Sequence, residues 1–315
     1  MRLSVGLGLK AWLAWRLFGP EIAVTREIRQ DRPLRIPGRT VFVGDREFFV
    51  RETGPADATP LVLLHGWSFD GEMTFFAVIP GLAERYRLII PDNRGHGRSE
   101  WIRGPYDIAD VADDVAGVLA ALGVEQAVVF GYSMGGMVAQ ELAHRHPSRV
   151  SKLILAGTAA RPIRPDAAFR VALWLGRTVS RVSRREFSAI TMRVLRRTNA
   201  LKSKHSRWMW EALMRRDANL YYEAGNAVRR FDARRWIDVI EVPTMVIVNT
   251  ADQLVPSSAQ YELASHFRDE DVVEIRGGRH ESIMNRADEY VSIISEFAGR
   301  VPGTDHQVPG SERDG

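Results

Sequence analysis

Runs of mainly apolar residues recur along the chain at the length of single β-strands. Each is four to seven residues long, which fits a strand that is buried on both faces of a sheet. They lie at residues 61–64, 87–90, 127–130, 153–156, 243–249 and 271–275. Apolar residues at helical spacing fill residues 108–122, and again the stretch from 134 to the proline at 147. This alternation predicts parallel strands that are joined by right-handed helical crossovers.

The region before the first buried run has a different pattern. Residues 40–43 and 47–52 alternate between apolar and polar positions around a Gly-Asp-Arg turn, which predicts an antiparallel hairpin at a sheet edge. Residues 73–85 predict a helix, with a break near Pro80 and Gly81. Together these patterns predict an α/β fold with a doubly wound, mostly parallel, eight-stranded sheet.

From Pro162 the strand–helix rhythm stops, and the pattern is helical up to residue 236. Helices are predicted at residues 169–179, 186–195, 206–215 and 219–231. The segment is rich in Trp, Met and Tyr, so we interpret it as a cap over the strand ends. Its apolar side chains either wall a pocket or form the core of the cap itself. The organisation is then an N-terminal helix and connector at 1–39, a core at 40–160 and 237–299, a cap at 161–236, and a disordered tail at 300–315.

Composition changes this picture in two ways. The chain has no cysteine, which excludes disulfides, thiolate metal ligands and a cysteine nucleophile, and favours a reducing compartment. Residues 161–235 hold 19 Lys and Arg but only 6 Asp and Glu, while the rest of the chain is net acidic. The basic segment is either a surface that faces an anionic partner, such as membrane headgroups, or a solvated arginine-rich face.

Residues 1–20 are apolar with two tryptophans, but Lys10 and Arg16 interrupt them. Neither uninterrupted part reaches the roughly 20 residues that a membrane span needs. On a helical projection Arg2, Lys10 and Arg16 lie on one side, as in a helix that rests in a membrane interface. The alternative is a helix that docks on the protein itself or on a second protomer. We therefore expect a cytoplasmic protein, with peripheral membrane association as one alternative.

The candidate chemistry begins at residues 131–135, which read Gly-Tyr-Ser-Met-Gly between a strand pattern and a helix pattern. A serine in a sharp strand-to-helix turn has a strained backbone, and its two flanking glycines avoid collisions where the chain approaches itself. The turn exposes the Ser133 hydroxyl at a helix N-terminus, where negative charge is favoured. Ser133 is therefore the candidate nucleophile.

A serine hydroxyl needs a base to take its proton, and a histidine base is usually oriented by a carboxylate. Asp252 follows one buried strand and His280 follows the next. Because active sites in such sheets lie at the carboxyl ends of the strands, we expect both side chains at the same sheet edge as Ser133. The sequence thus predicts the catalytic set Ser133, Asp252 and His280.

At this point the chain resembles the α/β-hydrolase family from about residue 40 to residue 298. Its motifs are His65-Gly66-Trp67, the turn at 92–99, the pentapeptide around Ser133, Asp252 and His280. The resemblance implies Ser133 as nucleophile, His280 as general base and acid, and Asp252 as orienting acid. It also implies an oxyanion hole made by the backbone N–H groups of Trp67 and Met134. The family commonly has glycine directly before this histidine, whereas Arg279 stands there in this chain.

A serine nucleophile implies an acyl-enzyme, so we expect hydrolysis of a carboxylic ester with an apolar or lipid-like part. Alternatives are a carbon–carbon bond hydrolase or an acyltransferase on the same residues, or a catalytically slow receptor that binds a ligand. A scaffold that acts at the membrane surface through the basic cap is a further alternative. The expected partner is a small-molecule ester, without nucleic acid, cofactor or metal; the oligomeric state stays open.

Overall fold

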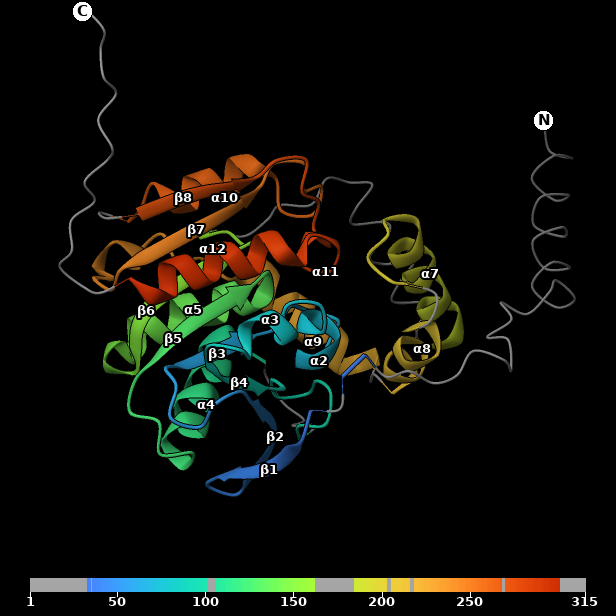
Figure 1. The fold of residues 1–315 in the computed structure, drawn as a ribbon, viewed down its shortest axis with the longest axis horizontal. Helices are drawn as coiled ribbons and strands as arrows, with labels where there is room; N and C mark the ends of the chain where they lie inside the picture. Colours follow the sequence, from blue (N-terminus) through green and yellow to red (C-terminus); the bar gives the residue numbers. More distant parts are fainter. Residues whose placement is uncertain are drawn as a thin grey trace, which may run out of the picture.

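In the computed structural model, the described residues are 33–34, 36–100, 106–161, 184–202, 205–215, 218–267 and 270–300. They contain one eight-stranded sheet with the strand order β1-β2-β4-β3-β5-β6-β7-β8 (Figure 1). The strands are β1 (Gly38–Val43), β2 (Arg46–Thr53), β3 (Pro60–Leu64), β4 (Arg87–Pro91), β5 (Ala127–Tyr132), β6 (Val150–Ala156), β7 (Thr244–Asn249) and β8 (Glu270–Ile275). The predicted eight-stranded α/β sheet is therefore confirmed.

The first two strands form the predicted antiparallel hairpin, with Gly44 at a positive φ of 63° in its turn. β2 also pairs with β4 in antiparallel register, and β3 to β8 pair in parallel. Parallel pairing brings the carboxyl ends of β5, β7 and β8 to one edge of the sheet. That edge is where the three candidate catalytic residues leave their strands.

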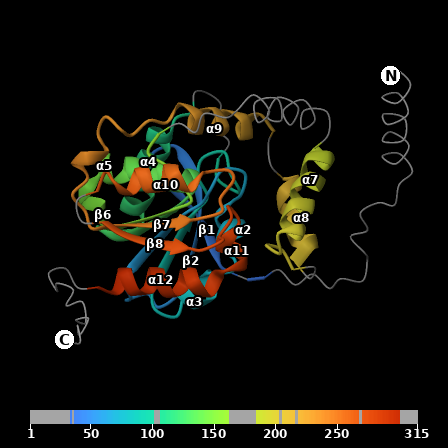
Figure 2. The ribbon, with the colours of Figure 1, turned by 90° about the horizontal axis from the view of Figure 1, so that it is seen from above.

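Helices cover both faces of the sheet (Figure 2). On one face, α4 (Ile108–Ala121), α5 (Met134–Arg145) and α10 (Ser257–Ala264) pack on a core that includes Val129, Leu155 and Val246. On the other face, α3 (Ile79–Leu82) and α12 (Ala287–Gly299) pack on a core that includes Phe130 and Ile247. The core strands bury both faces, which is why their sequences are continuously apolar.

The predicted break in the helix over residues 73–85 is present, but it lies before Pro80 and Gly81. The structure has two short helices there, α2 (Gly71–Phe75) and α3, and the break falls between them at residues 76–78. Pro80 lies in the first turn of α3. A proline is tolerated in a first turn because the N–H that it lacks has no intrahelical acceptor there, so Pro80 belongs to a helix start.

Three helices of the predicted cap are described: α7 (Arg184–Arg197), α8 (Ser206–Met214) and α9 (Ala218–Arg230). α7 and α8 lie side by side at one end of the molecule, and both figures show them away from the sheet. The helix predicted at residues 169–179, the helix predicted in residues 1–20 and the tail from residue 301 lie outside the described residues. Among the helices that are described, none combines the length and apolar character needed to cross a bilayer.

A buried ionic cluster joins β2, α2 and the turn after β4. The Arg51 guanidinium donates from Nη1 to Asp92 Oδ1 at 2.8 Å and from Nε to Glu72 Oε2 at 3.2 Å. Asp92 also accepts the backbone N–H groups of Gly71 and Arg98, both at 3.0 Å. The side chains of Arg51, Glu72 and Asp92 are buried. Loss of any one of them would leave a buried charge without its partner, so the cluster holds the turn against the sheet.

Asp70 caps the N-terminus of α2 beside this cluster, and we predict a pH-dependent effect of Asp70→Asn. Burial, followed by the nearby Asp92 charge, raises the pKa of Asp70 from 3.8 to about 6. The folded state therefore favours the protonated acid, and the wild type loses stability as the pH rises from 3.8 through about 6. Asparagine cannot ionise, yet it can still accept the Met73 N–H that Asp70 accepts at 2.8 Å.

Asp70→Asn should therefore raise the free energy of unfolding at pH 8 by on the order of 2 kcal/mol, and change it little at pH 4. Chemical denaturation of both proteins at the two pH values measures this difference. The matched control is Asp57→Asn, because Asp57 is exposed on a loop. A stability difference that is the same at pH 4 and pH 8 would contradict the prediction.

Candidate active site

The turn between β5 and α5 holds Ser133 in a strained backbone conformation. Its φ is 56° and its ψ is −120°, values that a residue other than glycine rarely adopts. The chain approaches itself closely here: a Cβ added to Gly135 would lie 1.9 Å from the Leu64 carbonyl oxygen. Added to Gly131, it would lie 2.4 Å from the Gly135 carbonyl oxygen. Only glycine fits at both positions, which explains the Gly-x-Ser-x-Gly spacing.

The structure brings the three predicted side chains together. His280 Nε2 lies 3.0 Å from Ser133 Oγ, and His280 Nδ1 lies 2.8 Å from Asp252 Oδ2. The other Asp252 oxygen, Oδ1, accepts the backbone N–H groups of Leu254 at 2.8 Å and Val255 at 2.9 Å. The Asp252 side chain is fully buried, while that of His280 is 20% exposed.

This hydrogen-bond pattern assigns the proton on the imidazole. A carboxylate can only accept, so His280 Nδ1 carries the hydrogen that bonds to Asp252. Nε2 is then unprotonated and faces the Ser133 hydroxyl, where it can accept the hydroxyl proton. The arrangement can therefore generate a serine alkoxide equivalent at the edge of the sheet.

Gly66, the residue before the candidate donor Trp67, lies against the nucleophile. A Cβ added to Gly66 would be 3.3 Å from Ser133 Cβ and 3.8 Å from Ser133 Oγ. Trp67 is the next residue, and Gly225 of α9 packs on its indole ring. Met134 is the first residue of α5, where a backbone N–H has no acceptor within the helix. One candidate donor thus follows Gly66, which lies close to Ser133, and the other follows Ser133 itself in the chain.

His65 has a bracing role in this loop. Its Nδ1 lies 2.9 Å from the Gly66 carbonyl oxygen, and its Nε2 accepts the Asn93 backbone N–H at 2.9 Å. Burial lowers the pKa of His65 to about 4, which keeps the ring neutral as this acceptor role requires. His65 thereby ties the loop after β3 to the turn after β4.

Arg279 stands where the family commonly has glycine, yet His280 still contacts both Ser133 and Asp252. Gly277 makes the turn, with a φ of 69°. Gly278 is the residue that must be small, since a Cβ there would lie 2.6 Å from Ile275 Cγ2 and 2.8 Å from the Ile275 carbonyl oxygen. Arg279 is exposed. The steric requirement for glycine therefore falls one residue earlier than the position next to His280.

Sequence reasoning missed the polar residues beneath the site. Tyr132, Asn249, Ser282 and Tyr290 form a hydrogen-bonded network that reaches the backbone of His280. The one signal in the sequence was a polar residue, Asn249, at the end of an apolar run. The structure buries this residue completely. As for metals, the described part of the chain contains no group of three or more His, Asp or Glu residues that could hold an ion.

Comparison with known proteins adds independent information. A family model of the alpha/beta hydrolase fold matches residues 59–287. A non-heme chloroperoxidase from Streptomyces lividans is 31% identical over 236 residues, which cover 66% of this chain and 79% of that protein. A pimeloyl-acyl-carrier-protein methyl ester esterase from Aeromonas hydrophila is 28% identical over 254 residues, or 76% of this chain and 95% of the esterase.

A solved structure shows the same architecture. The enol-lactonase from Burkholderia xenovorans LB400 matches with a TM-score of 0.71 and 26% sequence identity. The match covers 83% of this chain and all of the lactonase chain. The residues that the family model matches include Ser133, Asp252 and His280.

Proposed function

This chain belongs to the α/β-hydrolase family and is a hydrolase, and we propose that it cleaves carboxylic esters through an acyl-enzyme on Ser133. The observation that carries the proposal is the line of contacts from Ser133 Oγ through His280 to Asp252, at 3.0 and 2.8 Å. In this proposal Ser133 is the nucleophile, His280 is the general base and acid, and Asp252 orients the imidazole.

The first half-reaction follows from these contacts. His280 Nε2 takes the hydroxyl proton while Ser133 Oγ forms a bond to the ester carbonyl carbon. The carbonyl π electrons move to oxygen, and the backbone N–H groups of Trp67 and Met134 bind that oxyanion. One such donor typically lowers the activation free energy by ~3–4 kcal/mol. The tetrahedral intermediate then collapses, and the alcohol leaves with the proton from Nε2.

The second half-reaction repeats the chemistry with water. His280 Nε2 takes a proton from a water molecule as its oxygen attacks the acyl-enzyme carbonyl carbon. The second tetrahedral intermediate expels Ser133 Oγ, which recovers its proton from Nε2, and the carboxylic acid departs. Asp252, whose negative charge lies beside Nδ1, stabilises the imidazolium that forms in each step.

The relatives favour an ester over the alternatives. One is named for a methyl ester and another for an enol-lactone, which is a cyclic carboxylic ester. A carbon–carbon bond hydrolase or an acyltransferase could use the same three residues, and a slow receptor could retain them. The test is turnover by purified protein of nitrophenyl esters of increasing chain length, beside a thioester panel. Absence of turnover above background on every ester would contradict the proposal.

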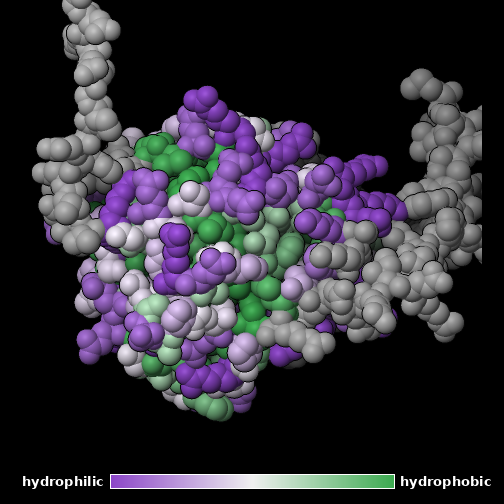
Figure 3. All heavy atoms as spheres, in the orientation of Figure 1, coloured by the Kyte–Doolittle hydropathy of each residue, from purple (hydrophilic) through white to green (hydrophobic). Residues whose placement is uncertain are grey.

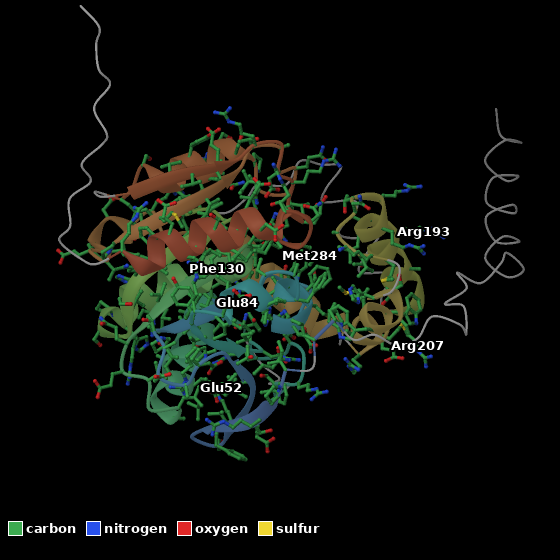
Figure 4. All side chains as sticks on the ribbon, in the orientation of Figure 1. Glu52, Glu84, Phe130, Arg193, Arg207 and Met284 are labelled. Carbon is green, nitrogen blue, oxygen red and sulfur yellow. The ribbon has the colours of Figure 1, made fainter. Side chains whose placement is uncertain are left out.

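We also propose that the enzyme works at an anionic membrane surface. The support lies on α7, where three basic residues, Arg193, Arg196 and Arg197, are exposed together with the apolar Val194. Arg193 lies on the side of α7 that faces away from the sheet (Figure 4). Figure 3 shows mainly hydrophilic residues in this region of the molecule. Such a surface would bring a lipid-like ester close to the cap.

The prediction is that the full chain floats with phosphatidylserine vesicles at low salt but not with neutral phosphatidylcholine vesicles. Each basic residue near an anionic bilayer contributes about 1 kcal/mol, so Arg196→Glu/Arg197→Glu should weaken vesicle binding at least ~10-fold. Deletion of residues 1–20 should weaken it too, and added salt should weaken it further. The matched control is Arg85→Glu/Arg276→Glu, which reverses two exposed charges outside the cap. Equal binding by both charge-reversal variants would refute the role of α7.

A further inference from the structure

A buried hydrogen-bond network lies directly beneath His280 and contacts its backbone. The Tyr132 hydroxyl, one residue before the nucleophile, donates to the His280 carbonyl oxygen at 2.5 Å. Asn249 Nδ2 donates in turn to Tyr132 Oη at 3.4 Å. The nucleophile strand is therefore connected to the main chain of the histidine loop by a route that does not pass through the catalytic side chains.

Asn249 is the centre of this network. Its Oδ1 accepts from the Tyr290 hydroxyl at 2.7 Å and from Ser282 Oγ at 2.8 Å. Its backbone oxygen accepts the Asp252 N–H at 3.2 Å, and its own N–H donates to Gln260 Oε1 at 2.9 Å. One fully buried residue thus contacts the nucleophile strand, the loop with the acid and the helices that follow the histidine.

The loops that carry the acid and the histidine are also packed together at this point. The Ala251 N–H donates to the Gly278 carbonyl oxygen at 2.9 Å. A Cβ added to Gly278 would lie 3.1 Å from Asn249 Oδ1, so the histidine loop lies almost in contact with the amide. With so little free volume, the position of the His280 backbone depends on the groups beneath it.

The two tyrosines are suited to act as donors. Burial, followed by the charges of Tyr290 and Asp252, raises the pKa of Tyr132 far above its ordinary value. Burial likewise raises the pKa of Tyr290 to about 12. Both hydroxyls therefore keep their protons at neutral pH. The Tyr132 hydroxyl can therefore act as the donor to the His280 carbonyl oxygen.

We propose that Tyr132 and Asn249 are positioning residues that hold the His280 main chain so that its imidazole meets Ser133 Oγ. This inference rests on the proposed function, in which His280 is the base. Neither residue reacts; both act through the histidine. Because proton transfer requires Nε2 within hydrogen-bond reach, a shift of the backbone by a fraction of an ångström would lower the rate of attack by Ser133.

The decisive variant is Tyr132→Phe, which removes one hydroxyl and keeps the buried ring. Its kcat for a nitrophenyl ester, and its rate of Ser133 modification by a fluorophosphonate, should fall ~10–100-fold, while KM changes less than about twofold. The matched control is Tyr86→Phe, because Tyr86 also donates a buried hydroxyl proton to a backbone carbonyl oxygen, that of Ser295 at 3.0 Å. Tyr86→Phe should lose similar thermal stability but keep kcat within about twofold.

Tyr290→Phe extends the test, because it removes a donor to Asn249 without touching His280. It should lower the same two rates by a smaller factor than Tyr132→Phe. If Tyr132→Phe loses no more kcat than Tyr86→Phe, the positioning role is overturned, whatever its effect on stability. Should Tyr132→Phe prove too unstable to purify, the Tyr290→Phe rates, compared with those of Tyr86→Phe, decide between the two outcomes.

A spectroscopic readout separates this inference from the proposed function. The Nδ1 proton that His280 shares with Asp252 gives a far-downfield proton resonance when the pair is held firmly. It should shift or broaden in Tyr132→Phe and stay unchanged in Tyr86→Phe. If the resonance changes in Tyr132→Phe but the wild type has no esterase activity, the positioning role is supported and the proposed function is contradicted. If the wild type is an active esterase but neither the resonance nor the rates change in Tyr132→Phe, the proposed function is supported and the positioning role is contradicted.

Discussion

Ser133→Ala is expected to lower kcat for ester hydrolysis by about 10⁴-fold or more, as removal of the nucleophile does in serine hydrolases. Without Oγ no acyl-enzyme can form, and His280 has no hydroxyl to deprotonate at 3.0 Å. KM should change little, since the groups that surround the substrate remain. The measurement is steady-state kinetics on a nitrophenyl ester, together with fluorophosphonate labelling of the wild type and the variant.

Ser295→Ala provides the matched control for this prediction. Ser295 is a buried serine on α12, and its hydroxyl has no hydrogen-bond partner among the described residues. Its replacement should leave both kcat and labelling unchanged. If Ser133→Ala kept substantial activity, or if labelling persisted in it, another residue would be the nucleophile.

The second large effect is expected for Asp252→Asn, which should lower kcat about 10⁴-fold with little change in folding. The structure gives a specific reason. Two backbone N–H groups, those of Leu254 and Val255, point at Oδ1, so the amide oxygen of asparagine must occupy that position. The amide NH₂ then faces His280 Nδ1 and must donate to it. The imidazole is forced into the tautomer that carries its proton on Nε2, and it can no longer accept one from Ser133.

Asp113→Asn is a suitable control, because Asp113 also pairs with a histidine, His146 at 2.7 Å, on the protein surface. His146 follows the C-terminal end of α5, whereas Ser133 precedes its N-terminal end. This change should leave kcat within about twofold. Nearly normal kcat in Asp252→Asn would show that another group orients His280.

Much of the fold could be predicted because its signals are local. A strand that is buried on both faces must be apolar along its length, so the runs that became β3 to β7 are visible without a structure. The nucleophile turn is visible for a steric reason, since only glycine fits at residues 131 and 135. Asp252 and His280 could be placed at one edge because parallel strands align their carboxyl ends.

Other features depend on contacts between distant segments. The helix break at residues 76–78 follows from the packing of α2 and α3 on the sheet, and Pro80 alone indicates the wrong position. Arg51 and Asp92 are 41 residues apart, and nothing near either residue in the sequence indicates their pairing. The same holds for Tyr132 and the His280 carbonyl oxygen, which are separated by 148 residues.

The sequence by itself determined which buried strands form, that they pair mainly in parallel, and which three side chains meet at one edge of the sheet. Apolar periodicity and the steric demands of glycine act over a few residues, so they can be read directly. Only the tertiary structure decided how the imidazole is held, with Asp252 on one side and Tyr132 and Asn249 below. Those hydrogen bonds join groups that chain folding alone brings within 3.5 Å of one another, and burial makes each of them costly to break.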